Sequence, residues 1–378
     1  MPQLTALEVV RFVNLMNGLP SYFVEAMLLA PQLTAIHVSG HCRWPRTYWQ
    51  SLEESPVIPS HMKEFTWMLK VPLESMRYQE LLTSSWPCLS ELSLIGQSPP
   101  AHSTANVDFA PLFFNIPSLQ IFTILVPQCA YLSRITLLLP SATNSYPALD
   151  SLRSLKISFP DPKDIIFDRL PESLHHLSLT DWPRHYLHVD EGAIVRSLHW
   201  TSPILTSSEL HDILRRCRCS ALESLEVVYK EDNSDGDVLL HMAHVFPALR
   251  TLKIFRYRWS SHDLVDIKAI RRSLSHLTEL RTLFIHIDMD GASMPAQWEE
   301  RKARIRGMEY RASLGDLAQA LVEGLAPSLE QIYMLERWPM GGTSNWKPWE
   351  VIREIDEGEV RTICRKVDGR NLREQSDK

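Results

Sequence analysis

Pairs of histidines are the residues whose type and spacing come closest to a chemical site in this sequence. His185 and His188 lie three residues apart, as do His241 and His244, so each pair could place two imidazoles together on a helix. A zinc site needs three or four ligands, and neither pair has a nearby cysteine or acidic set that completes one. We therefore expect packed or solvent-exposed histidines and predict no metal site.

Two further groups have both a chemical and a simpler structural explanation. Cys217 and Cys219 lie among arginines, which could lower the pKa of a thiol, but cations that offset the dipole at a helix C-terminus give the same pattern. His286, Asp288 and Asp290 alternate along one predicted strand and could face a cation, although Ca²⁺ requires six to eight oxygen ligands. We favour the structural explanation for both groups.

Enzyme motifs are absent from the sequence. It contains no P-loop, no dinucleotide-binding glycine fingerprint, no H-E-x-x-H and no G-x-S-x-G. The 378 residues include 52 leucines and 25 prolines but only 13 glycines, whereas phosphate-binding loops depend on glycine. We therefore expect neither enzymatic activity nor a cofactor.

The charge of the chain is mildly acidic, with 39 basic and 45 acidic residues and a net charge of −6. This balance gives no electrostatic reason to bind nucleic acid or an anionic membrane. The uncharged stretch from Phe109 to Ser133 contains three prolines, which would break a membrane-spanning helix. Scattered cysteines and an N-terminus without signal-peptide character lead us to expect a cytoplasmic or nuclear protein.

An internal repeat organises the chain. The pattern L-x-x-L-x-[L/I/V] occurs in thirteen copies, most of them between 20 and 31 residues apart. Positions 4 and 6 of each copy should point inward from a short strand, and position 5 should point outward. Eleven of the thirteen residues at position 5 are polar, which indicates a parallel sheet with one solvated face. The copies begin at Leu4, Leu33, Met62, Leu89, Leu119, Leu132, Leu152, Leu174, Val195, Leu222, Leu249, Leu280 and Leu329.

Over about residues 1–335 the chain resembles leucine-rich repeat proteins, which implies an α/β solenoid curved like a horseshoe. The parallel sheet would form its concave face, and helices or 3₁₀ turns its convex face. The asparagine of the usual repeat is missing, so we expect an irregular solenoid. Residues 336–378 are expected to form a capping hairpin and a tail, with strands at Val351–Ile355 and Glu359–Ile363. Helices are predicted at Ser21–Ala30, Ser207–Cys217, Val238–Phe246, His262–Leu274, Trp298–Arg311 and Leu314–Leu325.

The repeats of the form P-x-L-x-x-L-x-I, their Trp- and Pro-rich connections and the charged hairpin resemble the repeat arms of fungal F-box proteins. That resemblance implies a receptor that selects substrates for an SCF ubiquitin ligase. The F-box itself is not present, so an SCF adaptor would be a partner only if an F-box exists upstream. A free-standing scaffold or inhibitor unrelated to ubiquitination is the alternative.

Outward positions 3, 5 and 7 of the later repeats are the candidate contacts for a protein partner on the concave face. Phe255, Phe284 and Tyr333 would form an aromatic cluster of the kind that anchors interfaces, although single exposed aromatic side chains also occur without a partner. The predicted contact residues are Lys156, His176, His199, Glu226, Lys253, Phe255, Phe284, His286, Tyr333 and Leu335.

Overall fold

The computed structural model forms two compact units. The first comprises Met1–Pro183 with Leu198–Pro203, and the second Arg184–Ser197 with Ile204–Lys378. The structure describes residues 7–12, 30, 32–40, 61–72, 85–97, 109–126, 134–139, 148–182, 184–185, 202–260, 265–289, 300–337, 344–356 and 359–367.

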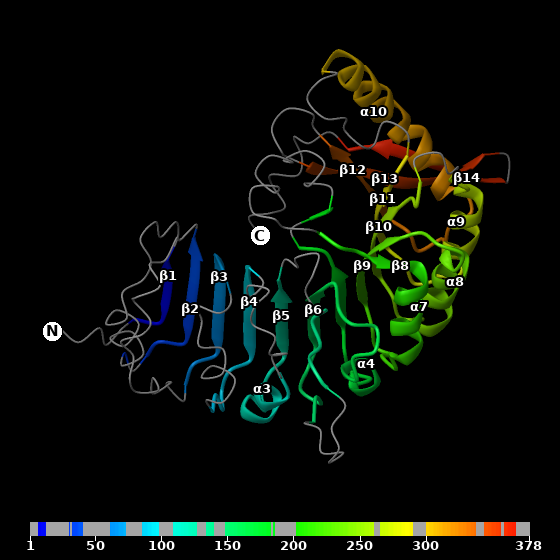
Figure 1. Ribbon diagram of the computed structural model, residues 1–378. Coiled ribbons are helices and arrows are strands. Elements are labelled where there is room, and N and C mark those ends of the chain that lie inside the picture. Colours follow the sequence, from blue (N-terminus) through cyan, green and yellow to red (C-terminus); the bar gives the residue numbers. More distant parts are fainter. Residues whose placement is uncertain are drawn as a thin grey trace. The chain divides into compact units, whose positions relative to one another are not determined.

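The first unit is a parallel sheet in which strands follow one another in chain order (Figure 1). Two short helices, α3 (Ala110–Asn115) and α4 (Ile166–Arg169), lie between its strands. Positions 4 and 6 of the repeat point into the core, as alternation requires: Leu92 and Leu94 of one strand are almost fully buried. The strands are β1 (Val9–Phe12), β2 (Ala35–Gly40), β3 (Glu64–Pro72), β4 (Glu91–Gln97), β5 (Ile121–Leu125), β6 (Ser154–Ser158) and β7 (His176–Thr180).

Among the described residues, two of the predicted repeats differ from the structure, and the copy starting at Val195 lies outside the described residues. In the first repeat Val10, rather than the expected Leu7, lies opposite Ile36, so the strand begins three residues later than its leucines suggest. The copy starting at Leu132 adds no strand to the sheet, because β5 pairs directly with β6. Residues 134–139 instead meet the chain beyond β6 through an isolated bridge between Ile135 and Pro160.

A buried carboxylate holds this extra segment in place. Asp164 is fully buried and accepts hydrogen bonds from the backbone N–H groups of Leu137, Leu138 and Ile166. Burial raises the pKa of Asp164 to about 6, although the three N–H donors act in the opposite direction. Asp164, which the repeat pattern does not include, thus adds two side-chain hydrogen bonds to the backbone bonds that hold this segment.

The second unit places helices on one face of its sheet. Figure 1 shows α7 (Ser207–Arg216), α8 (Asp235–Val245) and α9 (Ile267–Leu274) side by side on this face. Their strands are β8 (Leu205–Thr206), β9 (Ser224–Lys230), β10 (Thr251–Tyr257), β11 (Thr282–Ile287) and β12 (Gln331–Arg337). Helix α10 spans Glu300–Val322 and joins into one element most of the two helices predicted at Trp298–Arg311 and Leu314–Leu325.

A backbone ladder connects consecutive repeats within each unit. The carbonyl at position 2 accepts two N–H groups from the next repeat: Thr34 accepts those of Lys63 and Glu64, and Glu223 those of Arg250 and Thr251. These bonds use main-chain atoms only. The ladder thus satisfies the ends of the strands without the asparagine side chain of the usual repeat.

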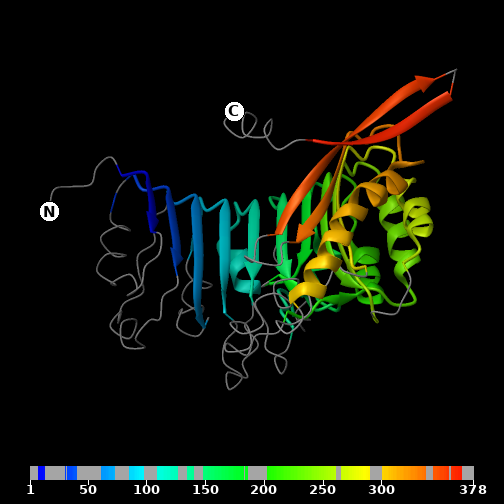
Figure 2. The same cartoon turned by 90° about the horizontal axis from the view of Figure 1, so that it is seen from above.

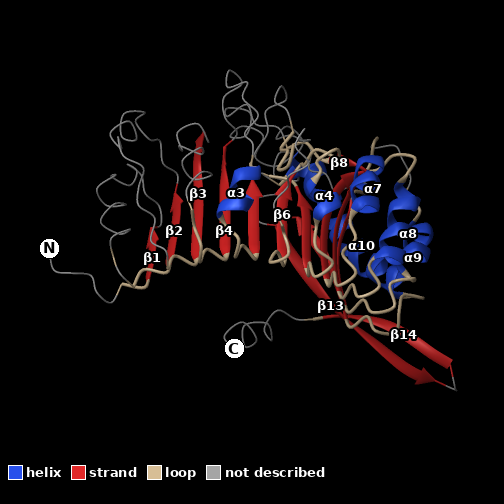
Figure 3. Ribbon diagram, turned by 90° about the horizontal axis from the view of Figure 1, so that it is seen from below, coloured by secondary structure: helices blue, strands red, loops and turns tan. Residues whose placement is uncertain are grey.

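An antiparallel hairpin follows the last parallel strand. Strand β13 (Ser344–Asp356) pairs with β12, and β14 (Glu359–Lys366) pairs with β13. The far end of this hairpin extends beyond the helices (Figures 2 and 3). Its first residues occupy part of Met340–Pro348, whose glycines and proline would favour a loop, and this placement matters for the site.

Candidate binding surface

Side chains of the second unit form three cross-strand rows on the sheet face opposite α7–α9. Because parallel strands pair in register, each repeat contributes one residue to every row. The polar row consists of Ser224, Thr251, Thr282, Gln331 and Glu350. The mixed row consists of Glu226, Lys253, Phe284 and Tyr333. The covered row consists of Val228, Phe255, His286 and Leu335.

The mixed row joins a charged cluster to an aromatic stack. Glu226 lies 2.6 Å from the guanidinium of Arg184 and 3.1 Å from the ammonium of Lys253. Beside them the rings of Phe284 and Tyr333 stack with centroids 4.2 Å apart and planes 14° from parallel. All four residues of the row are half-buried, so they remain accessible while their neighbours fix their positions.

The covered row differs from the sequence prediction. Phe255, His286 and Leu335 do lie on the expected face, but each is only 1% exposed and is therefore not open to a partner. Together with Val228 and Tyr257 they belong to a small core on the outside of the sheet. This finding corrects their expected role as contact residues.

Trp346 covers much of this row. It stands opposite Leu335 on β13, and its ring lies 5.3 Å from those of both Phe255 and Phe284. From the other side, the Arg184 guanidinium lies 4.9 Å from the Phe255 ring centre. The role of Trp346 is not evident from the sequence, because the glycines and the proline around it favour a loop.

The remaining predicted contact residues belong to the first unit. Lys156 is half-buried on β6 between Thr123 and Ser178, in a row of small hydroxyl side chains. His176 is exposed at the start of β7. His199 lies outside the described residues. The first unit therefore presents a small polar surface, whereas the aromatic contacts lie in the second.

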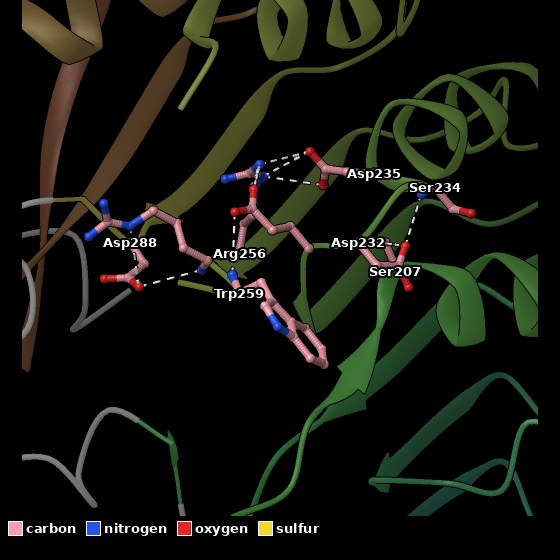
Figure 4. A network of polar contacts seen from close by, with 9 residues as sticks. Ser207, Asp232, Ser234, Asp235, Arg256, Trp259 and Asp288 are labelled. Carbon is pink, nitrogen blue, oxygen red and sulfur yellow. Dashed lines mark hydrogen bonds and ion pairs between the residues drawn. The ribbon is translucent and has the colours of Figure 1, made fainter. Parts of the chain in front are cut away.

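A buried ion network fixes the loops beyond β9 and β10 (Figure 4). Arg256 pairs with Glu231 and with Asp235, the latter at 2.9 Å, and Glu231 also accepts the N–H of Trp259. Directly after the neighbouring strand β11, Asp288 lies 3.7 Å from Arg258. These contacts hold the loops that follow the surface strands in one conformation.

Asp232 connects the same region to helix α7. It accepts hydrogen bonds from the hydroxyl of Ser207 and the N–H groups of Ser208 and Ser234. Burial acts to raise the pKa of Asp232, but these hydrogen bonds outweigh it and lower the pKa to about 2. Thr206 completes the helix start through a capping box with Glu209.

The histidine pairs do not form metal sites in the described part of the chain. The ring centroids of His241 and His211 are 5.0 Å apart, and those of His244 and His276 are 5.9 Å apart. Each histidine of the pair on α8 therefore contacts a histidine from α7 or from just beyond α9. His188 lies outside the described residues. Among the residues that the structure describes, no group of three or more histidine, cysteine or acidic side chains could hold a metal.

The cysteine pair is buried rather than reactive. Cys217 and Cys219 are 2% and 0% exposed, and burial raises the pKa of Cys219 to about 12. This is opposite to the shift that an activated thiol requires. Asp288, from the other candidate group, is engaged with Arg258, and Asp290 lies outside the described residues.

The strand register and the framework positions define a leucine-rich repeat solenoid, an α/β fold. No protein-family model matches the sequence, and no curated protein matches it. The leucine-rich repeat-containing protein LegL7 from Legionella pneumophila is 12% identical, with 89% of this chain and 92% of that chain covered and a TM-score of 0.40. CroV588, described as a novel circular LRR protein structure, is 11% identical, with 77% and 39% covered and a TM-score of 0.30.

The described helices include none that combines the length and the apolar character needed to cross a membrane.

Proposed function

We propose that the chain is a protein-interaction module and that the mixed and polar rows of the second unit form its contact surface. The observation that supports this proposal most directly is the Phe284–Tyr333 stack beside the Arg184–Glu226–Lys253 cluster. Aromatic and charged side chains held in position by a rigid sheet make good interface anchors, because little side-chain entropy is lost on binding.

Proximity labelling in cells of the source organism would test this surface. Thr282 lies in the middle of the polar row, directly beside Phe284, so Thr282→Arg should block a partner without disturbing the core. Leu240→Arg introduces the same side chain on helix α8, where Leu240 is 37% exposed, and serves as the control. We expect Leu240→Arg to retain the wild-type partners and Thr282→Arg to lose them. Equal recovery by both variants would contradict the assignment of the surface.

In its more specific form, the proposal is that the repeats select substrates for an F-box-like ubiquitin ligase receptor. Its support is the resemblance of the repeats and the charged hairpin to the arms of such receptors. Recovery of an SCF adaptor with the native transcript product, and loss of partner ubiquitination in Thr282→Arg, are the expected results. Stable capture of a partner whose ubiquitination does not change would instead favour the free-standing scaffold or inhibitor.

A further inference from the structure

The outer edge of β14 carries an unusual cap. Val351 donates its N–H to Glu330, so alternate peptide groups of β13 face β12, and the others face β14. By the same alternation, the peptide groups of Thr362 and Cys364 point away from β13. Both meet Gln319 of α10: its Oε1 accepts the Cys364 N–H at 2.9 Å, and its Nε2 donates to the Thr362 carbonyl at 2.9 Å.

Gln319 therefore occupies the place of a neighbouring strand. A side-chain amide offers one acceptor and one type of donor, as a peptide group does, and here both are used on one edge. Without a cap, the edge of a sheet is a template for pairing with another chain. We propose that Gln319 holds α10 over a self-complementary edge and that, when its two hydrogen bonds are lost and α10 moves off this edge, β14 pairs with β14 of a second copy of the chain.

The sequence of β14 identifies the second copy as the occupant. Antiparallel pairing about Thr362 would place Val360 opposite Cys364, Arg361 opposite Ile363, and the position of Glu359 opposite Arg365 of the other copy. No like charges meet in this register, and two symmetry-related pairs of opposite charges do, one on each side of the two-fold axis.

The neighbouring two-fold registers are less favourable. Pairing about Arg361 would set this residue against itself, and pairing about Ile363 would set Arg361 against Arg365. Both arginines are exposed in the chain, so these contacts would be repulsive. The favoured register also covers Val360, which is 66% exposed. The charges thus select one arrangement of two copies.

Sedimentation velocity of purified protein over a wide concentration range tests the role of the cap. Gln319→Ala should convert a monomer into a concentration-dependent dimer. Glu323→Ala is the matched control, because Glu323 lies directly after the end of α10, accepts from Gln319 and pairs with Arg271. Gln319→Glu is a second variant that keeps the acceptor for Cys364 and loses the donor to Thr362, so we expect weaker dimerisation than with alanine.

Second substitutions in the Gln319→Ala background test the pairing itself. Thr362→Pro removes an outward N–H while leaving the bonds to β13, and it should restore the monomer. Glu359→Arg should weaken the dimer, and adding Arg365→Glu should strengthen it again. The proposal is overturned if folded Gln319→Ala stays monomeric, if its dimer survives Thr362→Pro, or if the charge exchange fails to restore association.

Discussion

Arg256 is held almost entirely out of water between two carboxylates. Its side chain is 7% exposed, and those of Glu231 and Asp235 are 14% and 19% exposed. A charge in this position is stabilised only by its partners, because the surrounding protein replaces water poorly. Replacing Arg256 by methionine keeps most of the side-chain volume but leaves two carboxylates close together without a cation.

The expected cost follows from this geometry. Removing one member of a buried ion pair costs about 3–5 kcal/mol, so Arg256→Met should lower the free energy of unfolding of the second unit by about that amount. Arg281→Met is the matched control: Arg281 and Glu330 are 55% and 65% exposed and 3.7 Å apart. An exposed pair of this kind contributes about 0–1 kcal/mol.

Urea denaturation followed by circular dichroism and tryptophan fluorescence would measure both variants. Adding Glu231→Gln to Arg256→Met should cost less than Glu231→Gln costs alone, because the remaining carboxylate no longer has a cation to lose. If Arg256→Met and Arg281→Met lower the free energy of unfolding equally, or if the effects of Arg256→Met and Glu231→Gln simply add, the burial argument is wrong.

Two further predictions concern other parts of the fold. Because the folded-state pKa of Asp164 is raised from 3.8 to about 6, the unfolded chain releases this proton first, and stability should fall by about 2 kcal/mol as the pH rises from 4 to 6. Asp164→Asn should remove that part of the pH dependence in denaturation curves; an unchanged slope would show that another group causes it. Thr206→Ala should cost about 1 kcal/mol and increase hydrogen exchange at the start of α7, whereas unaltered exchange there would contradict the capping role.

The inward framework of the repeats could be predicted from the sequence alone. Leucines such as Leu225 and Leu252 recur at fixed positions, and burial of alternate residues follows directly from strand geometry. The copy at Leu132 shows the limit of this reasoning. Its pattern fits a strand, but the sheet passes from β5 to β6 without it, because pairing depends on which segments meet in space.

The candidate surface could be predicted only in part. The residues at the fifth positions, such as Lys253 and Tyr333, face outward as expected and are half-buried. Phe255, at a seventh position, is covered by Trp346 of β13, which lies about ninety residues later in the sequence, and by Arg184. Nothing in the glycines and proline around Trp346 indicates a strand, so its contact with Phe255 could not be foreseen. Gln319 likewise gives no signal, since its role depends on the neighbouring edge.

The carbonyl ladder between repeats has a consequence for how such a chain can change. Because the ladder uses the backbone N–H and the backbone oxygen of position 2, it does not require a particular side chain there, and the residues found there differ widely in size and charge. They are Glu8, Thr34, Lys63, Ser90, Gln120, Arg153, Glu223, Arg250 and Arg281. Mutations can therefore accumulate at these sites without loosening the connection between repeats. In such a scaffold, substitutions can change the surface side chains one at a time while the backbone hydrogen bonds between repeats are kept.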